Sequence, residues 1–374
     1  MGKARYIAGG VAALAAAGTV AVGIAYGPQI STAASVSRVS SYRGSYNLYE
    51  MTVGYDYDLD KILEANLHDD QAYVDAVLAQ VLPGVPLKVK APEFACSAFR
   101  AQLTNGEVVM GRNYDFKIDT SALLVRNNPK NGYASIGFSA LSNLKANDAD
   151  GSLKSRLAAL LGPFAPLDGV NERGVSIAVL TLDSPATDQR TVKPAVNTSL
   201  AIRLVLDRAA TTQEAVDLLK RYDMHAMAGR DYHFFVSDAT GDSRVVEYDP
   251  KVDDRRLVVT PVREVTNYYE LYADEVSPNQ KNGELGHGKE RACAIADVLD
   301  TNEGSMTRDV AWQALRAAAQ EPNPEDITSN TQWSVVFNNT DLTAEVCLRR
   351  NWDDKFEFAI SDIPGRRGLH RSRD

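Results

Sequence analysis

The sequence has few cysteines and histidines, and it has no stripe of positive charge. Three cysteines in 374 residues are too few for a disulfide framework. We expect Cys293 and Cys347 to be buried free thiols, with a disulfide between them as the alternative. The five histidines show no cysteine-peptidase motif or metal-ligand spacing, so we expect no metal and no cofactor. A net charge of -9 argues against nucleic-acid binding, whose affinity comes mainly from neutralising phosphates.

The first residues have the layout of a secretory signal. Lys3 and Arg5 precede the stretch 6–26, which contains no charged residue and is followed by small residues at 31–35. Such a stretch is also close to the roughly 20 residues that cross a bilayer. We therefore expect an exported protein, extracellular or in the cell envelope, with residues 6–26 either cleaved or kept as a membrane anchor.

Composition divides the chain into four parts. The boundaries are 1–26 for the signal or anchor, 27–95 for a linker and helical prosegment, 96–364 for the main domain and 365–374 for a basic tail. Small polar residues over 31–45 are typical of a linker. Apolar spacing over 63–82 predicts an amphipathic helix, which the Pro-Gly-Val-Pro sequence that follows ends.

Strand and helix patterns after residue 95 predict a mixed α+β fold. Runs of strands are interrupted by runs of helices without regular alternation, which favours a mostly antiparallel sheet. The expected strands begin at 108, 175, 234, 245, 257, 334, 344 and 356, and the expected helices cover 199–209, 213–222, 290–299 and 308–319.

Cys96 is the candidate nucleophile. A free thiol has a pKa near ~8.5 and attacks as the thiolate, so it needs a base. If the chain were cleaved between Ala95 and Cys96, the new α-amine, with a pKa of roughly 7.7–8.0, would stand on the same residue as the thiol. Arg112 and Asp115 follow Cys96 by 16 and 19 residues (112 − 96 and 115 − 96). A strand, a turn and a returning strand of that length bring both beside it.

These motifs resemble a known family. Cys96-Ser97 followed by Gly-Arg-Asn-Tyr-Asp at 111–115 is similar to the opening of choloylglycine hydrolases, which include bile salt hydrolases and penicillin V acylases. The resemblance is strongest to the exported linear amide C–N hydrolases, and acid ceramidase is a more distant relative. It covers about 96–362 and includes the motifs at 168–174, 232–234, 265–267, 289–291 and 331–336.

The resemblance implies a fold and a set of site residues. The fold would be the four-layer αββα sandwich of N-terminal-nucleophile hydrolases. Cys96 would be the nucleophile, Arg112 and Asp115 the pair that orients it, Asn267 an oxyanion donor and Arg291 a later arginine of the site. Bile salt hydrolases have asparagine where this chain has Thr181. We therefore expect a backbone N–H near that residue to serve the oxyanion, and the bile-salt assignment is weakened.

Each assignment has a structural alternative. Cys96 could be a buried structural thiol, Arg112 and Asp115 a surface ion pair, Asn267 a loop cap and Arg291 a solvated helix residue. We expect turn geometry to explain Asn171, hydrogen-bonded core or rim positions to explain His225 and His233, and packing to explain Trp333.

The predicted function is a self-processing cysteine amidohydrolase. Its substrate would be a small linear N-acyl amide, such as an N-acyl amino acid, a conjugated bile salt, penicillin V or an N-acylethanolamine. The alternatives are an acyltransferase that uses the same thiol, and an unprocessed envelope binding protein without activity. A homo-oligomer is compatible with the sequence.

Overall fold

The computed structural model of the chain describes residues 26–42, 46–84, 95–281, 283–323, 325 and 329–366. The predicted signal or anchor over 6–26 lies outside these residues except for Tyr26, and most of the basic tail lies outside them too. Within the described ranges, no helix combines the length and the apolar character that a membrane span needs.

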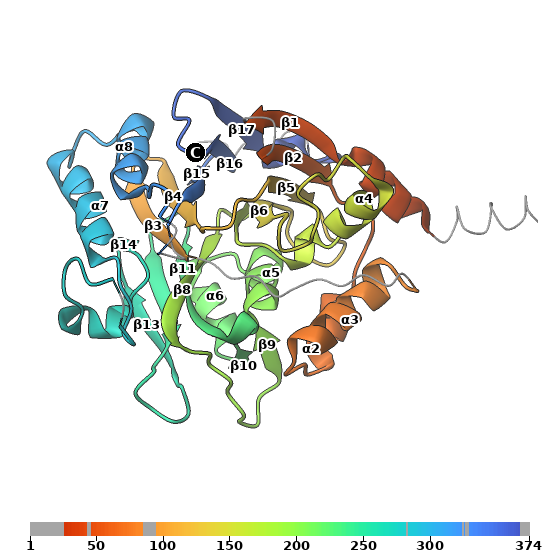
Figure 1. Cartoon of the computed structure of the whole chain (residues 1–374), viewed down its shortest axis with the longest axis horizontal. Helices are drawn as coiled ribbons and strands as arrows, with labels where there is room; N and C mark the ends of the chain where they lie inside the picture. Colours follow the sequence, from red (N-terminus) through yellow and green to blue (C-terminus); the bar gives the residue numbers. More distant parts are fainter. Residues whose placement is uncertain are drawn as a thin grey trace, which may run out of the picture.

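A nine-stranded sheet forms one half of the molecule (Figure 1). Its strand order is β1-β2-β5-β6-β7-β8-β11-β12-β13, and every neighbouring pair is antiparallel except β2 and β5. The strands are β1 (Ser37–Tyr42), β2 (Tyr46–Thr52), β5 (Ala122–Asn127), β6 (Ser135–Ala140), β7 (Asp168–Asn171), β8 (Ser176–Pro185), β11 (Arg230–Ser237), β12 (Ser243–Tyr248) and β13 (Leu257–Pro261).

A six-stranded antiparallel sheet forms the other half, in the order β14-β3-β4-β15-β16-β17. Its strands are β3 (Ala95–Gln102), β4 (Val108–Asp115), β14 (Glu264–Val265), β15 (Thr331–Asn338), β16 (Thr343–Leu348) and β17 (Lys355–Ala359). Strands β9 (Ala195–Asn197) and β10 (Asp223–His225) form a separate parallel pair.

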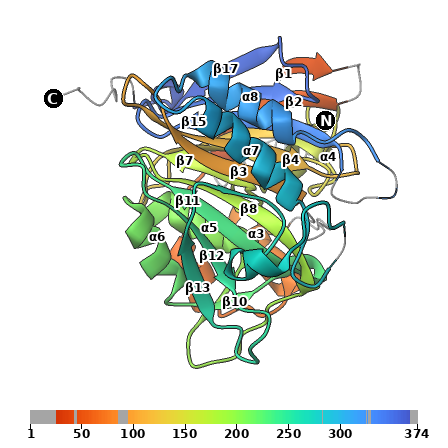
Figure 2. The same cartoon turned by 90° about the vertical axis from the view of Figure 1, so that its left-hand side faces the viewer.

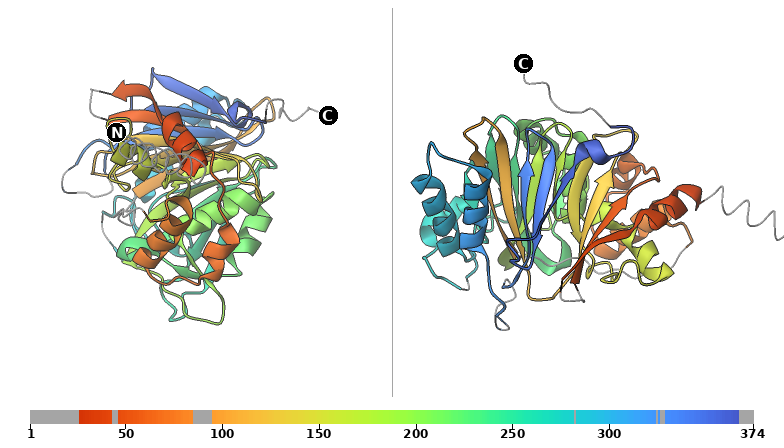
Figure 3. Two further views of the ribbon diagram at one scale, coloured as in Figure 1. Left: turned by 90° about the vertical axis from the view of Figure 1, so that its right-hand side faces the viewer. Right: turned by 90° about the horizontal axis from the view of Figure 1, so that it is seen from above.

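Helices cover the outer faces of the two sheets, which pack face to face (Figures 2 and 3). Helices α7 (Lys289–Thr301) and α8 (Arg308–Ala318) pack on the six-stranded sheet through a separate apolar cluster. Helices α5 (Thr198–Arg208) and α6 (Thr212–Leu219) contact the nine-stranded sheet. After Cys96, the other helical elements are α4 (Leu153–Ala159), η1 (Gly162–Phe164), η2 (Met227–Gly229), η3 (Glu270–Glu275) and η4 (Ile360–Asp362). The mixed α+β prediction is confirmed.

The described residues before Cys96 are part of the fold, so the expected linker over 31–45 is wrong over 31–42. Residues 26–35 are helical, and β1 and β2 extend the nine-stranded sheet through the parallel β2–β5 pairing. The helix expected over 63–82 is two helices, α2 (Leu59–Glu64) and α3 (Asp70–Val81). The break has local causes: Asn66 has a left-handed φ of 51°, and the Asp69 side chain accepts from the Ala72 N–H as a new N-cap.

The strands and helices expected after residue 95 are present within a few residues of their predicted bounds. The expected strands at 234 and 245 form a hairpin of β11 and β12, and Thr211 caps α6 through its side chain. Cys293 and Cys347 are free thiols, but Cys293 is exposed rather than buried.

Candidate active site

Cys96 is the second residue of β3 and faces the space between the two sheets. It lies opposite Tyr114 of β4, and its side chain is fully buried. Side chains two residues apart share a face of a strand, so Cys96, Tyr114 and the diagonal neighbour Arg112 point the same way. The register of this one hairpin therefore brings the guanidinium to the sulfur.

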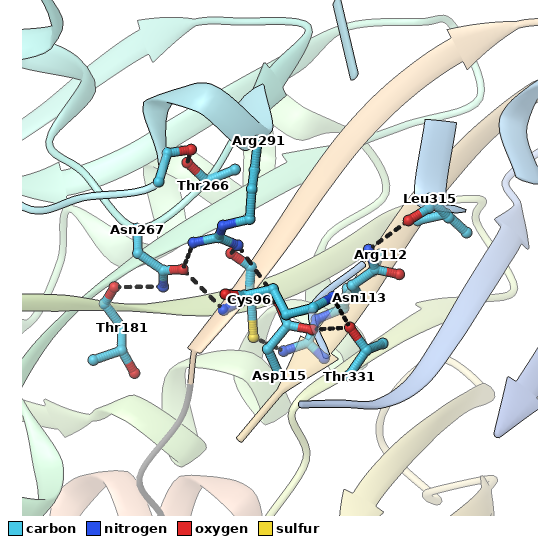
Figure 4. A network of polar contacts seen from close by, with 12 residues as sticks. Cys96, Arg112, Asn113, Asp115, Thr181, Thr266, Asn267, Arg291, Leu315 and Thr331 are labelled. Carbon is cyan, nitrogen blue, oxygen red and sulfur yellow. Dashed lines mark hydrogen bonds and ion pairs between the residues drawn. The ribbon is translucent and has the colours of Figure 1, made fainter. Parts of the chain in front are cut away.

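The Arg112 guanidinium contacts the sulfur of Cys96, as Figure 4 shows. Its Nη2 lies 2.9 Å from Cys96 Sγ and also donates to the Val179 carbonyl at 2.9 Å. Its Nη1 forms an ion pair with Asp168 of β7, and both of these charged side chains are fully buried. The predicted place of Arg112 beside the cysteine is confirmed, and the alternative of a surface ion pair with Asp115 is wrong.

Asp168 is a site residue that sequence reasoning missed, because its motif was interpreted as a turn. Its Oδ1 accepts from the Phe138 N–H at 3.1 Å while Oδ2 receives Arg112. A buried guanidinium without a counter-ion is strongly unfavourable. The Asp168 carboxylate therefore allows the charged Arg112 side chain to lie next to the sulfur of Cys96. The available signal was an acidic residue at the start of a strand whose four residues are all buried.

Asp115 points to the opposite face of β4, toward the α7 and α8 layer. Its Oδ2 accepts from Arg291 Nη1 at 3.4 Å and from Gln320 Nε2 at 3.0 Å. Its Oδ1 accepts from Thr331 Oγ1 at 2.6 Å (Figure 4). Arg291 is nine-tenths buried and also donates to the Cys96 carbonyl at 3.3 Å, so the alternative of a solvated helix residue is wrong. Gln320 and Thr331 had not been predicted as partners of this carboxylate.

Asn267 connects the cysteine main chain to β8. Its Oδ1 accepts from the Cys96 N–H at 3.2 Å and from Arg291 Nη2 at 2.8 Å, while its Nδ2 donates to the Thr181 carbonyl at 2.8 Å. Thr181 is nearly fully buried, and its hydroxyl has no partner among the described residues. Asn267 therefore contacts the candidate nucleophile directly, as a residue that merely caps a loop would not.

The backbone of Thr181 also faces the site. In an antiparallel strand, the N–H and C=O of one residue point to the same side. The Thr181 carbonyl points to Asn267, so its N–H lies on the same edge of β8. Strand β7 pairs with β8 only as far as Ala178, and no other described strand pairs with this edge of β8 at Thr181.

Burial dominates the electrostatics of the uncleaved chain. It raises the pKa of the Cys96 thiol to about 12, against the opposing effect of the Arg112 guanidinium. Burial also raises the pKa of Asp115 above its usual value, although Arg291 and the hydrogen bonds from Thr331 and Gln320 favour the charged form. At neutral pH the thiol of the intact chain is therefore protonated, and it needs a nearby base to become a nucleophile.

The other polar residues singled out in the sequence have structural roles. The Asn171 side chain accepts from the N–H groups of Arg173 and Val175, which confirms its turn role. His233 is buried against Glu247, and its Nε2 lies 2.9 Å from the Thr266 carbonyl next to Asn267. His225 lies between Asp70 and Asp188 at the boundary with α3. Trp333 is fully buried and stacks on Tyr114, as predicted.

The architecture and the site define a class: two face-to-face sheets with a buried cysteine at the start of β3, next to the edge strand β14. Residues 96–259 match the family described as linear amide C–N hydrolases, choloylglycine hydrolase family. Among solved structures, a mutant conjugated bile acid hydrolase from Clostridium perfringens is 16% identical, with a TM-score of 0.52 over 71% of this chain and 93% of that chain. Penicillin V acylase from Agrobacterium tumefaciens is 20% identical, with a TM-score of 0.52 over 71% of this chain and 86% of that chain.

A search of curated protein sequences gave no significant match. The matched region begins at Cys96, and the two solved structures share the fold. Over residues 96–259 the chain is therefore similar to the choloylglycine hydrolase family, whose model describes hydrolases that act on linear amide C–N bonds.

Proposed function

We propose that this protein is an exported cysteine amidohydrolase that becomes active when the bond between Ala95 and Cys96 is cleaved. The observation that carries the proposal is the set of contacts around Cys96: Arg112 on its sulfur, Asn267 on its N–H and Arg291 on its carbonyl. The main-chain contacts are already formed in the intact chain. Cleavage would therefore create an α-amine in a position that is fixed beforehand.

The new α-amine is the general base. Its ordinary pKa of roughly 7.7–8.0 is far closer to neutral pH than that of the buried thiol, so it can take the proton from Sγ. Arg112 stabilises the thiolate that results, because a positive charge 2.9 Å away favours the anion. Asp115 and Arg291 fix the main chain of Cys96, and with it the direction of the amine.

The oxyanion is held by Asn267 and by the backbone of β8. The Asn267 amide has two N–H donors, and the Thr181 carbonyl takes one of them. The second donor and the Thr181 N–H are on the side of Cys96, where a tetrahedral oxygen would form. Removing one such donor typically lowers kcat by about 10²–10³.

The reaction is acyl transfer to water. Thiolate attack on the amide carbonyl forms a tetrahedral intermediate, and the α-ammonium protonates the departing amine. Water, activated by the same amine, then hydrolyses the thioester and releases the acid. The substrate class is a linear N-acyl amide, such as an N-acyl amino acid, a conjugated bile salt, penicillin V or an N-acylethanolamine. Residues 6–26 direct the export of the protein, as a cleaved signal or a membrane anchor.

Hydrolysis of a panel of these amides by the cleaved protein tests the function. We expect the acid and the free amine in equal amounts, and no turnover by Cys96→Ala. The matched control is Cys347→Ala, which removes another buried thiol and should keep activity. Release of amine without free acid when a second amine is present would favour the acyltransferase. A folded, exported chain that hydrolyses no member of the panel and is never cleaved would favour the binding protein.

A further inference from the structure

A polar cavity lies at the same end of the six-stranded sheet as Cys96. It has a volume of about 370 Å³, and its walls include Lys117, Asp119, Asn330, Arg349 and Arg350. Strand β3 begins at this end, whereas β4 and β16 finish there, because their directions alternate. Lys117 follows Tyr114, the partner of Cys96, by three residues. Strand β4 ends at Asp115, and a fully extended chain rises ~3.3 Å per residue, so the Lys117 backbone lies at most about 10 Å beyond the level of Cys96.

The cavity is positively charged, although the whole chain is acidic. Arg349 forms an ion pair with Asp119, and the neighbouring Arg350 pairs through Nε with Glu321 at 3.2 Å, but Glu321 is 81% exposed. None of the ion pairs found in the described part of the chain involves Lys117. The cavity wall thus contains three cationic side chains and one partly buried carboxylate, namely Lys117, Arg349 and Arg350 against Asp119.

Arg349 has unused hydrogen-bonding capacity. Its side chain is only 9% exposed, and its guanidinium lies over the Tyr46 ring, 4.6 Å from the centroid. Its Nη1 pairs with Asp119, whereas its Nη2 is buried and has no partner among the described residues. An unpaired buried donor is costly, so a ligand with acceptor oxygens would relieve that cost.

The backbone that presents the two arginines is strained. Arg349 and Arg350 have consecutive left-handed φ values of 51° and 62°. This conformation is unfavourable for side chains other than glycine. Such strain persists where the surroundings fix it: the Arg349 N–H donates to the Gln332 carbonyl at 3.0 Å, and Arg350 Nη1 donates to the Thr331 carbonyl at 3.1 Å. The contacts of the Arg349 and Arg350 side chains therefore compensate for an unfavourable backbone conformation.

The cavity is also joined to the active site. Arg350 Nη1 donates to the Gln320 carbonyl at 2.9 Å as well as to Thr331. The side chains of Gln320 and Thr331 are the two that donate to the Asp115 carboxylate. The wall of the cavity and the hydrogen bonds to Asp115 are thus one network.

We propose that this cavity is a subsite for an anionic group of the substrate, with Lys117 and Arg349 as its recognition residues. This inference rests on the proposed function, which it deepens by selecting amides that carry a carboxylate. The carboxylate oxygens would accept from Lys117 Nζ and, with a small rotation of the guanidinium, from Arg349 Nη2. The carboxylate belongs either to the amine half of the substrate, as in an N-acyl amino acid, or to the acyl half, as in the amide of a dicarboxylic acid.

Matched substrate pairs and a charge-removing variant test the subsite. Each pair contains a carboxylate and its neutral carboxamide: N-acylglycine against N-acylglycinamide, and a dicarboxylic monoamide against its diamide. Lys117→Gln removes one exposed charge outside the catalytic contacts. The control is Lys154→Gln, which removes an exposed charge from α4.

We expect Lys117→Gln to lower kcat/KM for one anionic member by about tenfold, mainly through KM, and to leave its neutral partner unchanged. That factor corresponds to one charge-assisted contact. The pair that responds identifies the half of the substrate that carries the carboxylate. Arg349→Gln should act in the same direction, with its fold checked by thermal unfolding.

The failures of the two proposals are distinguishable. If wild type and Lys117→Gln hydrolyse the charged and neutral members equally well, the subsite is wrong and the amidohydrolase function stands. If the cleaved wild-type protein hydrolyses no member of either pair or of the wider panel, the proposed function fails, and the subsite fails with it.

Discussion

Cleavage at Cys96 should leave the segment before it attached to the hydrolase domain. Strand β2 lies inside the nine-stranded sheet and pairs with β5 over five residues, from Leu48 to Thr52. Leu48 and Met51 point to opposite faces of β2, and both are fully buried. Burying one such side chain contributes about 1.5–3 kcal/mol. The segment 26–84 places many more apolar residues in the main core, which offsets an association cost of ~4–15 kcal/mol.

The perturbation that tests this retention is Leu48→Ala combined with Met51→Ala. Each substitution should cost about 2–5 kcal/mol. The two side chains lie on opposite faces of the strand, so their effects should add to roughly 4–10 kcal/mol. Ile30→Ala is the matched control, because Ile30 lies in the same segment and is 54% exposed; it should change little.

The assay is gel filtration of the fully cleaved protein at submicromolar concentration, with mass spectrometry of each fraction. We expect both fragments in one peak for wild type and Ile30→Ala, and dissociation or unfolding for the double variant. Wild-type fragments in separate peaks, with the larger one folded and active, would refute the reasoning.

Three further results follow from the buried charges. Asp115→Asn should lower kcat by about a hundredfold or more in a folded protein, because the group that fixes Arg291 loses its charge; near-normal turnover would remove Asp115 from the site. Asp168→Asn should lower the free energy of unfolding by about 3–5 kcal/mol in urea titrations, because it leaves the Arg112 cation buried without a counter-ion. Hydrogen bonding to Asp70, with Asp188 on the other side, raises the pKa of His225; this contribution is fully present below the unfolded value of ~6.5 and is lost as the pH rises through the folded pKa. The N-terminal fragment should therefore dissociate more readily at pH 8.5 than at pH 6, and His225→Gln should remove this difference.

The sequence predicted the parts of the site that local geometry determines. Cys96, Arg112 and Asp115 belong to one hairpin, whose register puts the Arg112 side chain at the sulfur, as expected. The Asp115 side chain, which was expected beside the cysteine as well, lies on the other face of β4 and reaches the Cys96 main chain through Arg291. Asn267 and Arg291 were assigned by family resemblance, because no local pattern links residues more than 170 positions from Cys96.

The residues that were missed depend on contacts between distant elements. The Asp168 carboxylate meets Arg112 only because the two sheets pack face to face. Gln320 and Thr331 reach Asp115 across more than 200 residues of sequence. Strand β1, with the sequence Ser-Arg-Val-Ser-Ser-Tyr, has little apolar alternation, so its composition favoured a linker. Pairing within the sheet, rather than local propensity, makes it a strand.

The central claim is that activity begins when Cys96 becomes an N-terminus. Its most direct test follows purified intact chain over time. The fraction that begins at Cys96 is measured by intact mass, and amide hydrolysis is measured in the same samples. We expect turnover to rise in proportion to the cleaved fraction and to be absent at zero cleavage. Full activity from chain that retains Ala95 bonded to Cys96 would contradict the account.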